Sequence, residues 1–227
     1  QDELTNFGVW GGKEYIPQNY DGKFRGPVTL REALAQSLNI PSIKVFLDMA
    51  GIQDSINTAR DMGLTTIKDA SHYGPALVLG GGEVKLLDMV SAYGVFATEG
   101  IRLPYLPILR IENERGDIIK QQKNTPIRIL SQDASRLLND VLADNVARTP
   151  IFGGSSSLVV PGYQVSVKTG TTQEYRDAWA VGYTPLLAAG VWAGNSNNEP
   201  IRQSGVMIAA PVWNQFMREA LPLVSSR

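Results

Sequence analysis

The sequence predicts an α/β (α+β) fold in which helices pack against a mostly antiparallel sheet. Three strand-like segments, 163–169, 177–183 and 187–194, follow one another with only short connections between them. Short connections favour antiparallel neighbours, because parallel strands need a long crossover. Segments with helical periodicity gather before these strands, and one more helix follows them.

The composition is that of an ordinary globular protein. The 227 residues suit one large domain or two small ones, and a charged fraction of 19% argues against disorder. With 21 basic and 22 acidic residues, no basic excess favours nucleic acid as a partner. The absence of cysteine excludes disulfides and thiolate metal sites. Because the chain starts at Gln1 rather than at methionine, we expect a piece of a longer protein or a processed product.

The first helix is marked by its capping residues. Residues 1–28 are rich in Gly, Pro, Asn and Tyr and are expected to form an ordered loop. The sequence "TLRE" then forms a capping box, with Thr29 as N-cap and Glu32 reaching back to it. This helix is expected to end near Asn39, because Pro41 disfavours helical conformation in the residue before it.

Further helices and a hairpin fill the middle of the chain. One helix is expected to start at Pro41 and end at Gly51, and another to run to about residue 62. A strong apolar periodicity predicts a helix over 83–97, and a turn at "NERG" between two apolar runs predicts a β-hairpin. Ser131 is a good N-cap for a helix to about residue 146.

The last third is expected to contain a loop, the sheet and one helix. The stretch "TPIFGGSSSLVVPG" is expected to be a loop, and Pro211 to start the final helix. Near the second strand, Asp177 in "EYRDAW" is expected either to orient Arg176 or to cap a turn.

The first of the three strands carries the most informative motif, "QVSVKTGTTQEYRDAW". A lone lysine late in a strand is usually a solvated edge residue. Here the neighbours of Lys168 change that interpretation. Gly170 removes a side chain where a ligand could approach the backbone, and Thr169, Thr171 and Thr172 supply hydroxyls that can bind a carboxylate. The pattern predicts an anion-receiving strand edge to which an extended peptide can add.

A second motif, Ser37-Leu38-Asn39, closes the capped helix far upstream. Alone, such residues are usually turn or C-cap residues. Together with Lys-Thr-Gly on a strand, they are part of a three-motif set described for serine penicillin-recognising enzymes. The segments "NYDGKFRGPVTLREALAQSLNIPSIKV", "AYGVFATEG" and "VKTGTTQEYRDAWAVGYTP…GVWAGN" closely resemble the transpeptidase domain of class A, bifunctional penicillin-binding proteins. The resemblance runs from about residue 15 to residue 217.

The resemblance implies a penicillin-binding protein/serine β-lactamase-like fold and acyl-serine chemistry. Members cross-link peptidoglycan as D,D-transpeptidases, β-lactams trap their serine, and neither a cofactor nor a metal is implied. By resemblance, Ser37 would pass a proton to the leaving amine, Asn39 would bind the donor amide and Lys168 would hold Ser37 in a favourable field. The substrate-binding residues would be Thr169, Gly170 and Thr171, with the Thr171 N–H as an oxyanion-hole donor.

One motif of the set does not occur in this chain. No Ser-x-x-Lys is present: Ser42 is followed by Lys44, and Thr65-Thr66-Ile67-Lys68 has the spacing but a threonine. In the family the nucleophile lies upstream of Ser-x-Asn. We therefore expect residues 1–227 to be the C-terminal portion of a transpeptidase domain, without its serine helix and early strands. Such a fragment is expected to be inactive alone and marginally stable.

The expected partners are peptidoglycan stem peptides, β-lactams and the missing N-terminal part of the same domain. Because cross-linking occurs outside the cytoplasmic membrane, the resemblance implies an extracytoplasmic location, with the parent anchored by a segment absent here. Two alternatives remain open. One is a non-catalytic peptide-binding or scaffold module. The other is a serine β-lactamase-like hydrolase, which the lack of a Glu-x-x-x-Asn spacing disfavours.

Overall fold

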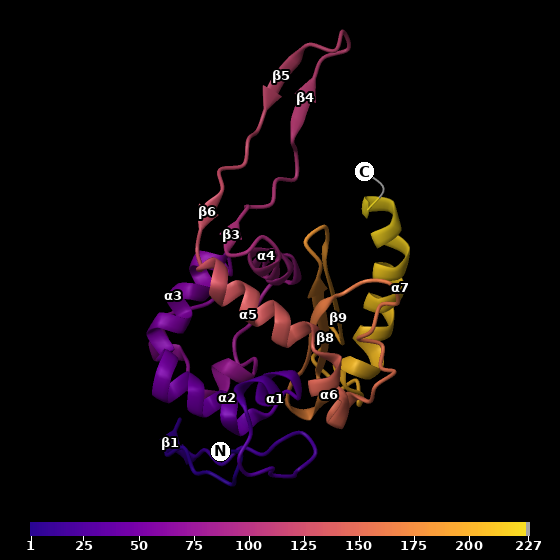
Figure 1. Ribbon diagram of the computed structural model, residues 1–227. Helices are drawn as coiled ribbons and strands as arrows, with labels where there is room; N and C mark the ends of the chain where they lie inside the picture. Colours follow the sequence, from indigo (N-terminus) through magenta and orange to yellow (C-terminus); the bar gives the residue numbers. More distant parts are fainter. Residues whose placement is uncertain (226–227) are drawn as a thin grey trace.

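The computed structural model describes residues 1–225 and has a three-stranded antiparallel sheet near its centre (Figure 1). The strands are β7 (Ser166–Thr171), β8 (Asp177–Tyr183) and β9 (Ala188–Gly194), and β8 lies in the middle. The predicted antiparallel sheet is confirmed, although β7 is displaced toward the C-terminus relative to the predicted strand. Since β7 and β9 are edge strands, β7 keeps one row of backbone groups available for a ligand.

One face of the sheet is covered by α7 (Gly205–Ser225). Trp213 and Met217 from α7 are fully buried, and they belong to the main core together with Val167 of β7 and Val165, which directly precedes that strand. The helix begins six residues before Pro211, so the predicted start was wrong. The added turn buries Ala209 and Ala210 completely, and this burial offsets the hydrogen bond that proline cannot make.

The opposite face is covered by α4 (Leu86–Ala97) and α5 (Gln132–Ala143). Helix α4 approaches β9 so closely that a Cβ on Gly190 would lie 2.5 Å from Val90 Cγ2. Only glycine permits this approach, because real Cβ atoms do not come so near a neighbouring carbon. The predicted helix over 83–97 is confirmed, with a start three residues later.

A second group of helices precedes the sheet in sequence. It comprises α1 (Leu30–Ala35), α2 (Asn39–Val45), a π-helical turn (Phe46–Ala50) and α3 (Ile52–Met62). The capping box of α1 is confirmed: Glu32 N donates to Thr29 Oγ1 (3.2 Å) and Thr29 N donates to Glu32 Oε2 (2.8 Å). Helix α2 starts at Asn39, two residues before the predicted start, because Pro41 is tolerated in a first turn whose N–H groups have no helical partner.

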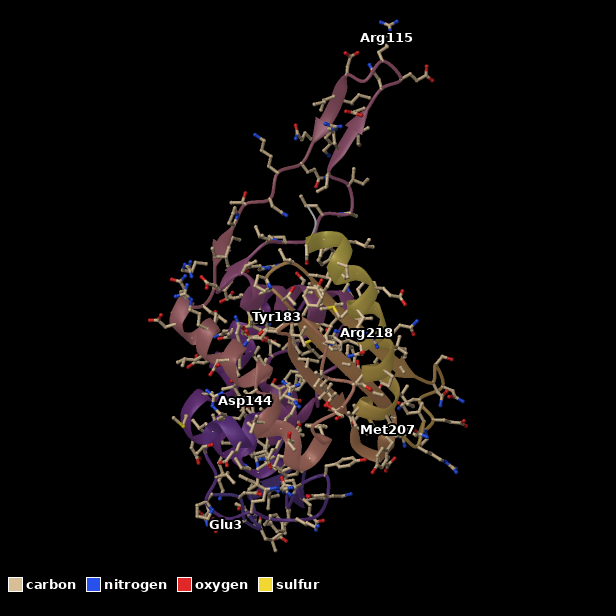
Figure 2. All side chains as sticks on the ribbon, turned by 45° about the vertical axis from the view of Figure 1, so that its right-hand side comes forward. Glu3, Arg115, Asp144, Tyr183, Met207 and Arg218 are labelled. Atoms are coloured by element: carbon tan, nitrogen blue, oxygen red, sulfur yellow. The ribbon has the colours of Figure 1, made fainter. Side chains whose placement is uncertain are left out.

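The predicted helix after Ser131 is divided in two. Helix α5 ends at Ala143, and Asp144 then caps α6 (Asn145–Phe152) by accepting a hydrogen bond from Ala147 N (2.8 Å). The prediction of a loop from residue 149 onward was therefore wrong for its first four residues. Asp144 lies within the body of the molecule at this junction (Figure 2).

The predicted hairpin forms a long arm that extends from the body (Figure 1). Strands β3 (Ile101–Arg102) and β6 (Ile127–Arg128) pair at its base, and β4 (Arg110–Glu112) pairs with β5 (Ile118–Gln121) further out. Arg115 lies at the tip (Figure 2). In the N-terminal loop, β1 (Val9–Trp10) and β2 (Lys13–Glu14) make a small hairpin. Among residues 1–225, no helix combines the length and apolarity needed to cross a bilayer.

Candidate functional site

A cleft of about 1080 Å³ lies between the N-terminal helices and the free edge of β7. One wall comes from the N-terminal loop and the α1–α2 junction, with Tyr20, Ser37 and Asn39. The other wall comes from the end of β7 and the turn that follows, including Thr169 and Thr171. The two motifs that the sequence singled out therefore face one cleft, although 131 residues separate Ser37 from Lys168.

Ser37 is placed in the cleft by the way α1 ends. Its φ of 58° is in the left-handed region, which is uncommon for a residue with a side chain. The N–H of Ser37 donates to Leu34 O (3.1 Å) and that of Leu38 to Ala33 O (2.9 Å), which is the Schellman pattern at a helix end. Leu38 anchors the motif, since its side chain is only 2% exposed. The hydroxyl of Ser37 is thus directed by local backbone geometry rather than by a flexible loop.

Lys168 reaches under the cleft to Ser37. Its Nζ lies 2.7 Å from Ser37 Oγ and 2.8 Å from Thr169 O, so the amine is held at two points. Burial, together with the nearby positive charge of Arg148, lowers the pKa of Lys168 to about 8. The amine therefore loses its proton more readily than an ordinary lysine, so that it can give a proton to the Ser37 hydroxyl and, once neutral, take one from it.

Arg148 is a buried cation that the sequence did not point to. It lies in α6 with 3% of its surface exposed, and its guanidinium donates to the carbonyl oxygens of Asp144 and Leu142. Its Nη1 has no partner among the described residues. Burial lowers the pKa of Arg148 as well, while Asp144 opposes that effect. An arginine inside "DNVARTP" has no distinguishing sequence pattern, so only its place in the fold connects it to Lys168.

Asn39 ties the N-terminal loop to the second motif. Its Nδ2 donates to Gln18 O (2.7 Å), and its backbone N–H donates to Asn19 Oδ1 (2.8 Å). Asn19 in turn donates to both carboxylate oxygens of the fully buried Asp2, at 2.8 and 2.9 Å. One side-chain N–H of Asn39 is therefore used inside the protein, and its Oδ1 is the atom that can accept from a ligand amide. Asp2 and Asn19 were not identified from the sequence.

The three threonines after Lys168 play different structural roles. Thr169 lines the cleft. Thr171 also lines it, and its Oγ1 accepts a hydrogen bond from Gly205 N (3.0 Å) at the start of α7, which leaves the hydroxyl proton for a ligand. Thr172 bonds to Asp177, at 3.0 Å between Oγ1 and Oδ2. Two of the three hydroxyls thus remain suited to a carboxylate.

Gly170 has a different environment from the one expected. It is not among the residues that line the cleft, and a Cβ placed on it would lie 3.3 Å from Trp179 Cβ on β8. A Cβ on Gly205 would lie 2.4 Å from Gly170 O, so the first turn of α7 packs directly on this peptide. In the structure, the absence of a side chain at Gly170 leaves room for Trp179 of β8, and the absence of one at Gly205 lets α7 approach.

The backbone of Thr171 presents its N–H to the cleft. The N–H of Thr172 donates to Asp177 O (3.1 Å) and so faces β8. Successive N–H groups of a strand point to opposite edges, so the N–H of Thr171 faces the free edge of β7. A backbone donor at this edge, beside a serine–lysine pair, is the arrangement that stabilises a developing oxyanion.

The turn after Thr172 is strained and carries an aromatic contact across the cleft. Glu174 and Tyr175 both have positive φ, at 59° and 57°. Each such residue costs about 1–2 kcal/mol, so the surroundings must hold the turn in place. The rings of Tyr20 and Tyr175 meet edge to face with centroids 5.9 Å apart, and both residues line the cleft. Their hydrogen bond raises the pKa of Tyr20.

A second hollow, of about 640 Å³, lies behind Lys168. Its walls come from α3, α4 and α5 and are mostly apolar. The larger apolar residues of this lining are Leu34, Met62, Leu64, Met89, Tyr93, Phe96, Leu138 and Leu142. We call it the back cavity. The back cavity is thus mostly apolar and open to the surface.

Comparison with known proteins gives a consistent result. A family model described as the penicillin binding protein transpeptidase domain matches residues 4–218. Penicillin-binding protein 1A of Aquifex aeolicus (strain VF5) is 33% identical over 209 residues, covering 91% of this chain and 28% of that protein. Penicillin-binding protein 2D of Bacillus subtilis (strain 168) is 31% identical over 230 residues, covering 97% and 32%. The chain therefore spans about a third or less of these relatives.

Solved structures share the architecture. The crystal structure of penicillin-binding protein 1A from Haemophilus influenzae has a TM-score of 0.85 at 22% identity, covering 97% of this chain and 38% of that one. The PonA1 protein from Mycobacterium tuberculosis, solved in complex with penicillin V, has a TM-score of 0.77 at 26% identity, covering 94% and 61%. The predicted fold class is thus confirmed.

Proposed function

The chain belongs to the family of penicillin-binding protein transpeptidase domains, and from this membership we propose that residues 1–227 are the C-terminal portion of a D,D-transpeptidase domain. The parent protein would cross-link peptidoglycan stem peptides and be acylated by β-lactams. The observation that carries the proposal is the contact between Lys168 Nζ and Ser37 Oγ at 2.7 Å, where Ser37 lines the cleft that Thr169 and Thr171 also line.

In the proposed reaction, a serine from a preceding segment attacks the carbonyl carbon of the D-Ala-D-Ala bond. A bond forms between the serine oxygen and that carbon, the serine's own proton enters the hydrogen-bonded path to Ser37, the C–N bond breaks, and D-alanine leaves with the proton that Ser37 passes to its nitrogen. An amine of a second stem peptide then attacks the ester carbon, the ester C–O bond breaks, and a proton of the amine returns to the serine oxygen. The positive charge of Lys168 acts on the Ser37 hydroxyl, while the Thr169 and Thr171 hydroxyls bind the terminal carboxylate.

Asn39 and the Thr171 backbone complete the proposed site. The Oδ1 of Asn39 would accept the N–H of the donor peptide, and its position is supported by the anchoring of Nδ2 to Gln18 O. The Thr171 N–H would donate to the oxyanion, supported by its place on the free edge of β7. Gly170 would contribute by leaving room for Trp179 of β8 at the end of β7 rather than by touching the substrate.

The back cavity is the proposed seat of the helix that carries the Ser-x-x-Lys motif. It is apolar, it lies between α3, α4 and α5, and Lys168 lines it as well. A helix placed there would bring its serine next to Ser37 and Lys168, because Lys168 connects the back cavity to the cleft. The free edge of β9 would pair with the early strands of the same domain, since the unpaired backbone groups of an edge strand are normally covered.

Labelling with a fluorescent penicillin tests the proposal. We expect the full-length protein to form a covalent adduct that survives denaturation and is released slowly, and the 227-residue chain to form none. Rapid turnover of the drug would instead support a hydrolase. No labelling of full-length protein, with the cleft still binding peptide, would support a non-catalytic module and refute the transpeptidase.

Location follows from the proposed substrate. Stem peptides are cross-linked outside the cytoplasmic membrane, so the parent would act in the periplasm or on the outer face of that membrane. Fusion of the full-length protein to a reporter that is active only outside the cytoplasm tests this. Activity supports the proposal, and a signal restricted to a cytoplasmic reporter would refute it.

A further inference from the structure

The connection between β7 and β8 is closed by a ring of hydrogen bonds around Asp177. The Thr172 hydroxyl donates to Asp177 Oδ2 (3.0 Å) and accepts from Asp177 N (2.8 Å), while Thr172 N donates to Asp177 O (3.1 Å). The hydroxyl therefore uses its proton and one lone pair within the connection. Of the two expectations for Asp177, capping a turn is the one the structure shows; Arg176 pairs with Glu174 instead.

The other oxygen of Asp177 is held by the far strand of the sheet. Trp192 Nε1, on β9, donates to Asp177 Oδ1 (2.9 Å). The indole reaches across Gly194, since a Cβ on Gly194 would lie 2.6 Å from Trp192 Cζ2. Asp177 and Gly194 are directly paired in the β8–β9 ladder. Glycine at this position thus makes room for the indole, and the carboxylate connects β9 to the end of β7.

Asp177 has no ion pair in the part of the chain that the structure describes. Both of its oxygens are used by neutral donors, one hydroxyl and one indole. This carboxylate lies at the edge of the cleft. With these neutral donors, it fixes the orientation of the Thr172 hydroxyl and the Trp192 indole rather than neutralising a charge. The group it orients most directly is Thr172, the residue after Thr171.

The peptide between Thr171 and Thr172 is therefore fixed from two sides. Gly205 N binds the Thr171 hydroxyl, and Asp177 binds both the backbone N–H and the hydroxyl of Thr172. Directly after it come Glu174 and Tyr175, whose positive φ values would otherwise drive the turn to relax. Relaxation of this turn would rotate the Thr171 N–H away from the cleft.

We propose that Asp177 is a positioning residue for acyl transfer: through Thr172 and Trp192 it fixes the end of β7, so that the Thr171 N–H faces the reacting carbonyl oxygen. This inference rests on the proposed function, because it assumes that an acyl group is transferred in the cleft. Asp177 itself touches neither the reacting atoms nor Ser37. Its effect is expected in the chemical step rather than in the binding of the ligand.

The structural half of the inference can be tested on the 227-residue chain without any acylation. Hydrogen exchange of the Thr172 amide reports on the hydrogen bonds between Thr172 and Asp177. The NMR signal of the Trp192 indole N–H reports on its hydrogen bond to Asp177 Oδ1. In Asp177→Ala we expect Thr172 exchange to accelerate at least about tenfold and the indole signal to move upfield. In Thr172→Val the indole signal is expected to stay. Unchanged Thr172 exchange in Asp177→Ala would overturn the proposal.

The functional half is tested in the full-length protein by β-lactam acylation under single-turnover conditions. Asp177→Ala and Thr172→Val are expected to lower the maximal acylation rate by about 10- to 100-fold, with the half-saturating concentration changed less than about threefold. Thr172→Ser keeps the hydroxyl and is expected to restore the rate. Matched exposed controls, Asp133→Asn and Thr125→Val, are expected to match wild type.

Rates are expressed per active site, by titration with the label, so that loss of folded protein does not imitate the effect. A merely structural role would lower the melting temperature and the active fraction but leave the rate per site unchanged, which would overturn the inference. Thr172→Val and Thr172→Ser acylating at equal rates would overturn it as well. Failure of wild type to acylate would refute the proposed function instead, and the exchange measurement would still decide the role of the ring.

Discussion

Two hollows with different linings lie on either side of Lys168, the cleft in front and the back cavity behind. The cleft has a mixed polar and apolar lining, and hydrogen bonds made by Asn39, Thr171 and Thr172 fix its walls. The back cavity is mostly apolar, and its large side chains, such as Phe96, line open space. Hydrogen bonds thus fix the walls on the Ser37 side of Lys168, whereas a mostly apolar hollow lies on its other side. The helix proposed for the preceding segment would fill that hollow.

The largest expected effect is on the cleft side. In the full-length protein, Lys168→Met and Ser37→Ala are each expected to slow β-lactam acylation by about 10²–10⁴-fold, because they remove the proton path to the leaving group. Stopped-flow measurement with a fluorescent penicillin gives the rate. Lys120→Met, on the exposed arm, is the matched control. If Lys168→Met acylates within about threefold of the wild-type rate, the proposed proton path through Lys168 is contradicted.

The next effect concerns the back cavity. A longer form that includes the preceding segment is expected to melt about 10 °C or more above the 227-residue chain, because filling an apolar hollow gains several kcal/mol. Differential scanning calorimetry of the two forms measures the shift. Identical cooperative transitions would show that nothing packs into the back cavity.

A single cavity residue sharpens the same comparison. Leu138→Ala is expected to cost about 2–5 kcal/mol in the longer form, where the side chain would be packed, but less than about 1 kcal/mol in the 227-residue chain. Leu137→Ala, one position along α5 and 68% exposed, is the control and is expected to have little effect in either form. Urea unfolding measures all of these. Equal costs of Leu138→Ala in both forms would contradict the proposed helix seat.

The pH dependence of stability gives the smallest expected effect. An unfolded lysine holds its proton to about pH 10.5, whereas burial lets Lys168 lose it near pH 8, so the unfolded state binds more protons between these values. The free energy of unfolding of the 227-residue chain is therefore expected to rise with pH in this window, by on the order of 2 kcal/mol. Lys168→Met should abolish the rise.

At still higher pH the trend should reverse. Burial raises the pKa of Tyr93 to about 12, so above its ordinary value of 10.0 the unfolded state loses this proton first and stability falls. Urea unfolding at a series of pH values from 7.5 to about 12 measures both the rise and the fall in stability. A wild-type chain with the same pH profile as Lys168→Met would show that the amine is not desolvated.

Much of the fold was predictable because local signals agreed with the tertiary structure. The capping box at Thr29, the antiparallel sheet and the hairpin arm all follow from short-range patterns. The errors came where tertiary contacts decide. The sequence predicted that the last helix starts at Pro211. In the structure α7 starts earlier, because Gly205 N donates to Thr171 Oγ1 and because Ala209 and Ala210 are buried. Asp144 divides one expected helix into two, because its side chain begins a new one.

The candidate site was predictable only in part. Ser37 and Lys168 were found through the combination of two motifs, and the structure brings their side chains together. Arg148, whose charge acts on Lys168, has no sequence signal, because a buried arginine is recognised only by its surroundings. The hydrogen bonds around Asp177 also have no sequence signal, because they connect residues from the end of β7, from β8 and from β9. Spacing along the chain cannot show that an indole on β9 reaches a carboxylate on β8.

The joint action of Ser37 and Lys168 is tested most directly by a double-mutant cycle on the maximal acylation rate of the full-length protein. If the hydroxyl and the amine form one proton path, Ser37→Ala combined with Lys168→Met should be no slower than the slower single variant, within about threefold. If the two losses multiply, the groups act independently, and the contact between them does not carry the reaction.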